Sequence, residues 1–351
     1  MSSRRDNWLR AARFERPELI PMRFHVTAPC WNHYPQDALQ GLMAEHPLLF
    51  PGYTVKDAPI EPSFAPWQRA GVPYTDGWGC VWETTVDGST GVVVQPALET
   101  WEGFEDYEPP DPESHNGWGP VDWERVAKDL ANAKANGRLA SGSLRHGHTF
   151  LTLSYIRGYE NLLFDMADDE PRLHRLIEMV EAFNMHIVRR YVALGVEWMG
   201  YPEDLGMQVG PMVSPELFRR WIKPVCQRLI APAREAGCII HMHSDGDIRA
   251  LADGLIEGGI QVLNLQDLVN GIDWIRDTLK GRVCIDLDID RQRITRFGTP
   301  AEIDAHIRGA VETLGSRDGG LMMIHGLYPG PPLANVKALM DAMEPYAAYY
   351  A

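Results

Sequence analysis

Cysteine is scarce in this chain, and no apolar run is long enough to cross a bilayer. The 351 residues include five cysteines, which are widely spaced and form no Cys-x-x-Cys pair. An odd number of separated cysteines predicts reduced thiols in a cytoplasmic protein rather than a disulfide framework. The first residues also lack the apolar stretch of a secretory signal. We therefore expect a cytoplasmic protein without a membrane partner.

Positive charge is also in short supply. Lysine and arginine number 33 against 48 aspartates and glutamates, which gives a formal net charge of -15 with the acids scattered along the chain. Nucleic acids and anionic membranes are bound by clustered lysine and arginine, so we expect neither as a partner. Small molecules are the expected ligands.

Glycine-rich phosphate loops are missing as well. The sequence contains neither a G-x-G-x-x-G run nor a Walker-type run, which argues against a doubly wound nucleotide-binding sheet. Short apolar segments instead alternate with amphipathic ones, and this alternation predicts a parallel sheet covered by helices. We predict one TIM-type (β/α)8 barrel over residues 1–351. Its residues 1–120 would form an irregular part with a lid, rich in proline and tryptophan, and residues 121–351 regular βα units.

The elements of the regular part are predicted from hydrophobic spacing and from Pro, Ser and Gly at helix ends. Helices are expected at 121–134, 171–194, 214–218, 248–256, 272–279, 299–314 and 332–343. Strands are expected at 139–142, 196–199, 238–240, 260–264, 282–285 and 321–324.

Polar side chains follow several of these strands, where a parallel barrel carries its chemistry. They are Glu203, Asp204, His241, His243, Asp286, Asp288 and His325. Since residues at i and i+2 of an extended segment point the same way, His241 and His243 would share one face, as would Asp286, Asp288 and Asp290.

Imidazole and carboxylate groups are ligands that zinc accepts, and an open catalytic site uses three of them. We interpret His243, Asp245 and His325 as such a set, with His241 as a fourth candidate. The alternative is structural, because histidines are commonly hydrogen-bonded without a metal, and Asp245 with the next two residues also fits a tight turn and a helix cap.

Further candidates surround this set. Glu203 and Asp204 would act as a general base, as a ligand or as turn caps, and Asp288 is a third candidate catalytic carboxylate. Substrate contacts are assigned to His25, on a first strand, to Tyr201, and to Trp78. Core packing is the competing interpretation of Trp78, which lies four residues before Trp82.

Four segments of the chain resemble the uroporphyrinogen decarboxylase superfamily, in particular its decarboxylase-like and corrinoid-methyltransferase branches. The segments are residues 76–82, 203–218, 243–248 and 325–336. The resemblance implies a TIM-type barrel and a possible homodimer. In the methyltransferase branch the zinc-binding segment has the form His-x-Cys-Gly, and a further cysteine lies in a late loop.

By this resemblance His243 matches the zinc-binding histidine, Asp245 stands at the first cysteine and His325 at the late one. Replacing both thiolates would make the metal a harder, more strongly Lewis-acidic centre. True porphyrinogen decarboxylases carry an arginine-rich stretch near the amino end, for which residues 22–29 offer no counterpart. We therefore discount a substrate with many carboxylates.

The resemblance then implies a zinc-dependent methyltransferase-like enzyme. It would move a methyl group between a small methoxy, methylthio or methylamino compound and a corrinoid carried by a separate protein. Two alternatives stay open, a metal-assisted decarboxylase or lyase of a small carboxylic acid on the same barrel, and a binding relative without catalysis.

Overall fold

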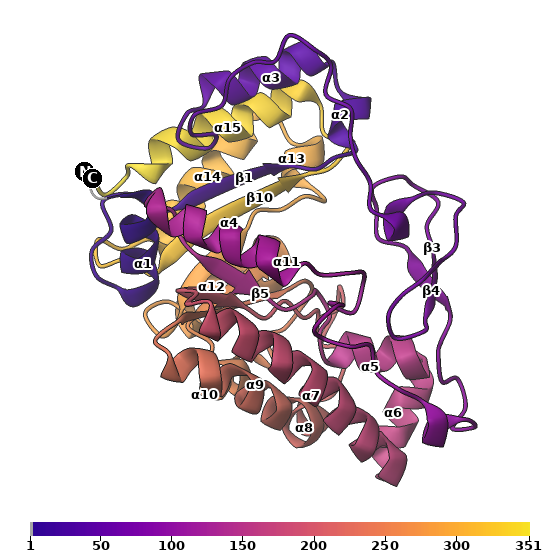
Figure 1. The fold of residues 1–351 in the computed structure, drawn as a ribbon. Helices are drawn as coiled ribbons and strands as arrows, with labels where there is room; N and C mark the ends of the chain where they lie inside the picture. Colours follow the sequence, from indigo (N-terminus) through magenta and orange to yellow (C-terminus); the bar gives the residue numbers. More distant parts are fainter. Residues whose placement is uncertain (1–2) are drawn as a thin grey trace. The chain divides into compact units, whose positions relative to one another are not determined.

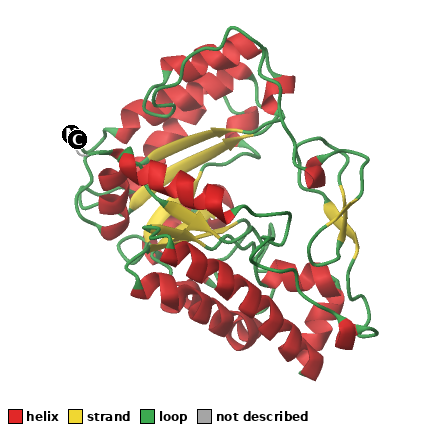
Figure 2. Cartoon of the chain, in the orientation of Figure 1, coloured by secondary structure: helices red, strands yellow, loops and turns green. Residues whose placement is uncertain are grey.

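The computed structural model describes residues 3–351, which divide into two compact units. One unit comprises residues 3–65 together with Asn264–Ala351, and the other comprises Pro66–Leu263. We call them the terminal unit and the central unit. Both contain parallel strands alternating with helices, as Figure 1 and Figure 2 show.

The terminal unit is built on strands β1 (Met22–Val26), β9 (Cys284–Asp288) and β10 (Leu321–Leu327). β10 pairs in parallel with β1, from Met22 opposite Met323 to Val26 opposite Leu327, and with β9 on its other side. Its helices are α1 (Arg4–Arg13), α2 (Cys30–His33), α3 (Gln36–Glu45), α11 (Asp267–Asn270), α12 (Ile272–Thr278), α13 (Ile294–Phe297), α14 (Pro300–Leu314) and α15 (Leu333–Ala347).

The central unit is built on β5 (Ser141–Ser143), β6 (Trp198–Gly200) and β7 (Ile239–Ser244), which also pair in parallel. Its α-helices are α4 (Trp123–Ala135), α5 (Phe150–Arg157), α6 (Tyr159–Asp168), α7 (Pro171–Ala193), α8 (Pro215–Leu217), α9 (Lys223–Glu235) and α10 (Ala252–Gly258). A π-helical turn, η3 (Phe218–Ile222), precedes α9, and Figure 1 shows α7 running beside α9.

A small antiparallel sheet completes the central unit. It consists of β2 (Tyr74–Thr75), β3 (Val81–Glu83) and β4 (Val92–Gln95), and lies between the short helices η1 (Pro66–Gln68) and η2 (Phe104–Asp106) in the sequence. Residues 46–120 hold only these short elements, whereas residues 4–45 contain α1, β1, α2 and α3.

The parallel strands follow the order β1-β10-β9-β8-β7-β6-β5, where β8 is Val262–Gln266. The α/β fold of TIM-barrel type predicted from the sequence is therefore confirmed, with seven strands in its parallel sheet within the described part of the chain. The assignment of residues 1–351 to one domain stays a prediction. Within residues 3–351, no helix combines the length and apolarity needed to cross a membrane.

The long helices form where the sequence places their signals. α14 starts at a capping box, in which the Thr299 side chain accepts from the Glu302 N–H and Glu302 accepts from the Thr299 N–H. α7 has Pro171 in its first turn and buries Leu173, Leu176, Ile177 and Val180 along one face. These positions agree with the predicted helices to within one residue.

The predicted strand ends are wrong, because the strands continue past their apolar runs. β7 includes His241 and His243, β10 includes His325, and β9 includes Asp286 and Asp288. Backbone pairing does not require an apolar side chain, so a strand can extend into polar residues at its carboxyl end. The helix predicted from residue 248 is also wrong at its start. Asp247 there accepts from the Arg249 N–H and side chain in a turn, and α10 begins at Ala252.

Two loops of the central unit touch backbone to backbone after β6 and β7. The Asp247 N–H donates to the Met207 carbonyl at 2.7 Å, and the Gly210 N–H donates to the Asp247 carboxylate at 3.2 Å. A Cβ at Gly246 would lie 2.2 Å from the Gly206 carbonyl carbon, and Gly246 has a φ of +80°. Only glycine permits this contact.

We predict that Gly246→Ala lowers the free energy of unfolding by several kcal/mol more than Gly210→Ala. Gly210 has nearly the same φ, +78°, but a Cβ there would meet nothing within 4 Å. Its substitution therefore costs only left-handed strain, roughly 1–2 kcal/mol, whereas Gly246→Ala must also push two backbones apart. Urea unfolding of both variants measures the difference, and equal losses would contradict the contact.

A buried ion pair joins α14 to α11 in the terminal unit, and its carboxylate also bonds to the loop after β9. His306 Nε2 lies 2.7 Å from Asp267 Oδ2, which also accepts from the Asp290 N–H at 3.1 Å. Burial opposes the charged imidazole, but the hydrogen bond to Asp267 and its negative charge outweigh burial and raise the pKa of His306.

This raised pKa predicts a loss of stability with rising pH. The folded chain binds the His306 proton more tightly than the unfolded chain, so the contribution is complete below about pH 6.5. It disappears as the pH rises through the folded pKa. Urea unfolding across this range should show a flatter pH dependence for His306→Gln than for the unsubstituted protein. Parallel pH profiles of the two proteins would exclude His306 as the cause.

Candidate functional site

Backbone pairing continues beyond the ends of β5 and β6 in the central unit and aligns three loops. The register places Gly200 opposite His241, and the N–H of Glu203 then donates to the His243 carbonyl at 2.9 Å. On the other side, the Gly147 N–H donates to the Pro202 carbonyl at 2.9 Å. The segments after β5 and β6 therefore run on beside each other and beside β7.

This alignment brings His146, Asp204 and His243 together. Asp204 Oδ1 lies 3.3 Å from His146 Nε2 and 3.5 Å from His243 Nε2. One ligand-type atom from each residue lies within 4.8 Å of the other two. The side chains keep access to solvent, with exposed fractions of 46% for His146, 25% for Asp204 and 22% for His243.

Charges within this group shift two pKa values. Burial favours the neutral form of Asp204, but its hydrogen bond to His146 and the charges of His146 and His243 outweigh burial and lower the pKa of Asp204. Burial likewise opposes charge on His146, and Asp204 overcomes it and raises the pKa of His146. The group thus favours a carboxylate with positive charge beside it.

Asp245 borders the group through its backbone and its side chain. Its N–H donates to Asp204 Oδ1 at 2.8 Å, and its Oδ1 lies 3.6 Å from His243 Nε2. The structure therefore brings together three of the residues predicted from the sequence, Asp204, His243 and Asp245.

His241 lies on the same strand as His243, two residues earlier. Both are half-buried while Met242 between them is buried, as expected for side chains that alternate along a strand. The His241 ring centroid lies 5.4 Å from that of Trp198. Its role as a metal ligand stays a prediction.

Glu203 is fully buried and holds the start of α5. Its carboxylate accepts from the backbone N–H groups of Thr149 and Leu151, at 2.6 and 2.9 Å. Burial raises the pKa of Glu203 to about 7, although these N–H groups favour the charged form. Since Thr149 directly follows the loop that carries His146, Glu203 fixes that loop onto the end of β6.

Two predicted substrate contacts of the central unit are buried. The Tyr201 hydroxyl donates to the Leu229 carbonyl at 3.1 Å, and burial raises the Tyr201 pKa. Trp78 packs edge-on against Phe183, with ring centroids 5.0 Å apart. These contacts make both residues part of the core, and substrate binding by either stays a prediction.

The other predicted site residues belong to the terminal unit. His325 is 1% exposed, its ring centroid lies 5.2 Å from that of Phe24, and burial lowers its pKa to about 3. Asp288 is buried and accepts from Arg291 at 2.9 Å. His25 is exposed on β1. Their roles as metal ligand, catalytic carboxylate and substrate contact stay predictions.

His146 is the residue that the sequence analysis missed. It lies three residues beyond the end of β5 (Ser141–Ser143), which overlaps the strand predicted at residues 139–142. The signal that was available is the histidine pair His146 and His148, directly before the apolar start of α5. His148 is fully buried, and burial lowers its pKa to about 3, so it is neutral.

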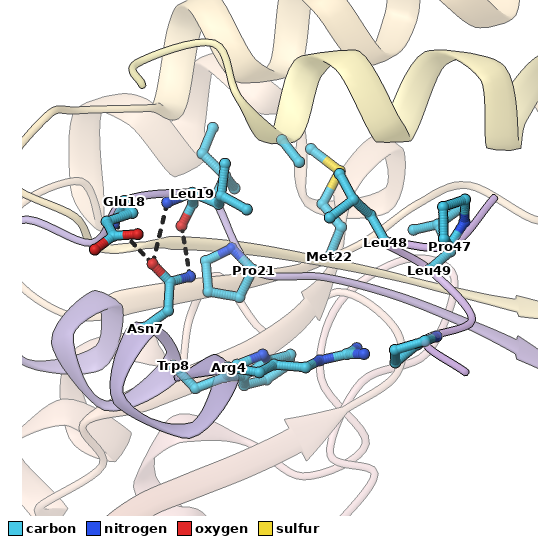
Figure 3. A pocket seen from close by; sticks show the side chains of 13 residues that line it. Arg4, Asn7, Trp8, Glu18, Leu19, Pro21, Met22, Pro47, Leu48 and Leu49 are labelled. Atoms are coloured by element: carbon cyan, nitrogen blue, oxygen red, sulfur yellow. Dashed lines mark hydrogen bonds between the residues drawn. The ribbon is translucent and has the colours of Figure 1, made fainter. Parts of the chain in front are cut away.

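A mostly apolar cavity of about 260 Å³ lies in the terminal unit at the start of β1, away from the carboxyl ends of the strands. Figure 3 shows Asn7 at its edge, where the side chain bonds to the backbone of Glu18 and Leu19. Arg4 and Trp8 line it together with Met22 and Leu48. None of the predicted site residues belongs to its lining.

Comparison with solved structures gives the fold independently. A methyltransferase from Methanosarcina mazei has a TM-score of 0.68 with this chain and covers 100% of both chains, at 15% sequence identity. A likeness of this kind shows a shared fold, which agrees with the barrel-type α/β architecture.

Comparison of sequences gives the family. The uroporphyrinogen decarboxylase of Thermus thermophilus is 24% identical over 184 residues, which are 52% of this chain and 51% of that protein. The chain thus spans about half the length of this curated relative. A family model described as uroporphyrinogen decarboxylase (URO-D) matches residues 79–346. This match includes His146, Asp204, His243 and Asp245 and most of the chain, which therefore belongs to the uroporphyrinogen decarboxylase family.

Proposed function

We propose that this protein is a metal-dependent methyltransferase-like enzyme. It would move a methyl group between a small methoxy, methylthio or methylamino compound and a corrinoid. The observation that carries the proposal is a cluster of two imidazoles, His146 and His243, and two carboxylates. His243 Nε2 lies 3.5 Å from Asp204 Oδ1 and 3.6 Å from Asp245 Oδ1. Such donors suit zinc, and they leave a side open to solvent.

A metal bound by these imidazoles and carboxylates would be more Lewis-acidic than a metal bound by thiolates. No cysteine belongs to the group, and all five cysteines are free, four of them buried and Cys226 half-buried. A bound zinc ion would supply Lewis acidity toward the methylated heteroatom or the accepting thiol. Imidazole and carboxylate ligands make that acidity stronger than thiolates would.

We assign different roles to the adjacent carboxylates Asp204 and Glu203 because their partners differ. Asp204 faces the two histidines, whereas both oxygens of Glu203 already accept backbone N–H groups. Asp204 is therefore the carboxylate placed to meet substrate or metal, and Glu203 positions the loop that carries His146. Asp288 stays a proposed catalytic carboxylate, and His25, Trp78 and Tyr201 stay proposed substrate contacts.

The corrinoid is assigned to a separate protein. The spacing Asp-x-His-x-x-Gly, typical of corrinoid-binding proteins, occurs once in this chain, at Asp304–Gly309. This segment lies inside helix α14, and Nε2 of its histidine, His306, is bonded to Asp267. A histidine held in this way is not placed to bind cobalt. A partner protein supplies the corrinoid in our proposal, and a homodimer is proposed on the resemblance alone.

A coupled assay tests the proposal. We predict that the zinc-loaded protein converts cob(I)alamin to methylcobalamin with at least one small methoxy, methylthio or methylamino donor. Chelation of zinc should abolish the conversion and added zinc should restore it, because the heteroatom is a poor leaving group without a Lewis acid. The visible spectrum of the corrinoid measures the conversion.

His174→Ala is the matched control, because His174 is an exposed histidine of α7 paired with Asp169, outside the site. This variant should keep the full rate. Consumption of a small carboxylic acid without any corrinoid would instead establish the decarboxylase or lyase alternative. A protein that binds neither metal nor donor would be the binding relative without catalysis.

A further inference from the structure

We propose that the metal ligands of this chain are His146, Asp204 and His243, all supplied by the central unit. This set replaces His325 and His241, two of the ligands predicted from the sequence, and moves Asp245 outside the ligand set. The proposal rests on the proposed function only in assuming that the protein uses a metal. The ion would be a divalent first-row cation, with zinc as the probe.

The distances fit a shared ion. Ligand bonds of about 2.0–2.1 Å in a tetrahedral zinc site place neighbouring ligand atoms about 3.3–3.4 Å apart. Asp204 Oδ1 lies 3.3 Å from His146 Nε2 and 3.5 Å from His243 Nε2. Both separations from Asp204 therefore match those of neighbouring zinc ligands, and the two imidazole nitrogens lie within 4.8 Å of each other.

The surrounding backbone holds the carboxylate in place without a metal. Asp204 Oδ1 accepts the Asp245 N–H at 2.8 Å, a contact of the kind that orients metal-binding carboxylates. Asp245 is itself fixed, because the next residue, Gly246, touches the Gly206 backbone. The proposed role of Asp245 is thus to position Asp204 through its backbone.

The two histidines are fixed from opposite sides. His243 belongs to β7, and its carbonyl accepts the Glu203 N–H. His146 lies in the loop between β5 and α5, which is fixed at Gly147 by the Pro202 carbonyl and at Thr149 by the Glu203 carboxylate. A site arranged in advance loses little conformational freedom when an ion binds.

The solvent exposure of the proposed ligands is typical of a catalytic zinc site and not of a structural one. Structural zinc sites are closed by four protein ligands, whereas catalytic ones use three and keep a position open. Here His146 is the most exposed ligand, at 46%. Its side is where water or a substrate heteroatom would complete the coordination. His325, by contrast, is 1% exposed and packs against Phe24.

Direct metal binding tests the ligand set without reference to activity. We expect His146→Ala, Asp204→Asn and His243→Ala each to weaken zinc binding at least about tenfold, the lower limit seen when only an outer contact of a metal ligand is lost. His325→Ala and His174→Ala should bind zinc as the unsubstituted protein does. Competition with a chromophoric chelator measures the affinity, and elemental analysis measures the stoichiometry. Full zinc binding by His146→Ala would overturn the proposal.

A second variant tests the ligand set by the appearance of a spectroscopic signal and not by a loss of zinc binding. His146→Cys places a thiol on an exposed loop, so the fold should tolerate it. Loaded with Co²⁺ alone, this variant should show a near-ultraviolet thiolate-to-cobalt charge-transfer band that His174→Cys and the unsubstituted protein lack. A Co²⁺ complex of His146→Cys without the band would show that residue 146 is no ligand.

The two proposals can fail separately. Zinc bound through His146, Asp204 and His243 in a protein that transfers no methyl group would refute the proposed function and leave the ligand set standing. Zinc-dependent methyl transfer that survives His146→Ala with unchanged zinc affinity would refute the ligand set and leave the function standing.

Discussion

The candidate site depends on parallel backbone hydrogen bonding that continues, in the same register, beyond the carboxyl ends of the strands. β6 ends at Gly200, yet Tyr201 and Glu203 still donate to the carbonyls of His241 and His243. Because parallel neighbours advance together, each residue past the strand end keeps a fixed lateral partner. That is why Asp204 arrives between His146 and His243. A shift of one residue in either pairing would turn the side chains to the other face.

The two adjacent carboxylates of this arrangement differ in burial and in their partners. Glu203, next to Asp204 in the sequence, is fully buried and bonded to the backbone at the start of α5, whereas Asp204 faces two partly exposed histidines. One carboxylate therefore fixes the loop, and the other is the one that we propose as a metal ligand. The proposed ligands are imidazoles and a carboxylate, and Asp245 and His325 stand at the two positions where the resemblance places the thiolates of methyltransferases. This difference would make a bound ion harder and more acidic.

The sequence predicted the barrel-type fold and the long helices well, because α7 and α14 carry clear periodicity and end signals. It also pointed to Asp204, His243 and Asp245. It missed His146 although it predicted the strand before it, because His146 lies three residues beyond the end of β5 and reaches Asp204 only through pairing of its loop with the segment after β6. Strand ends were misplaced at β7, β9 and β10 because polar residues at their carboxyl ends carry no hydrophobic signal. Lateral register, which decides the ligand set, is a property of pairing between distant segments.

Anomalous diffraction at the zinc edge, from crystals of the protein loaded with zinc, tests this account most directly. The account predicts one strong anomalous peak about 2.0–2.2 Å from His146 Nε2, Asp204 Oδ1 and His243 Nε2. It also predicts that the Asp245 N–H still donates to the same Asp204 oxygen. A peak bound to His325 or His241, with His146 turned away from it, would contradict the account.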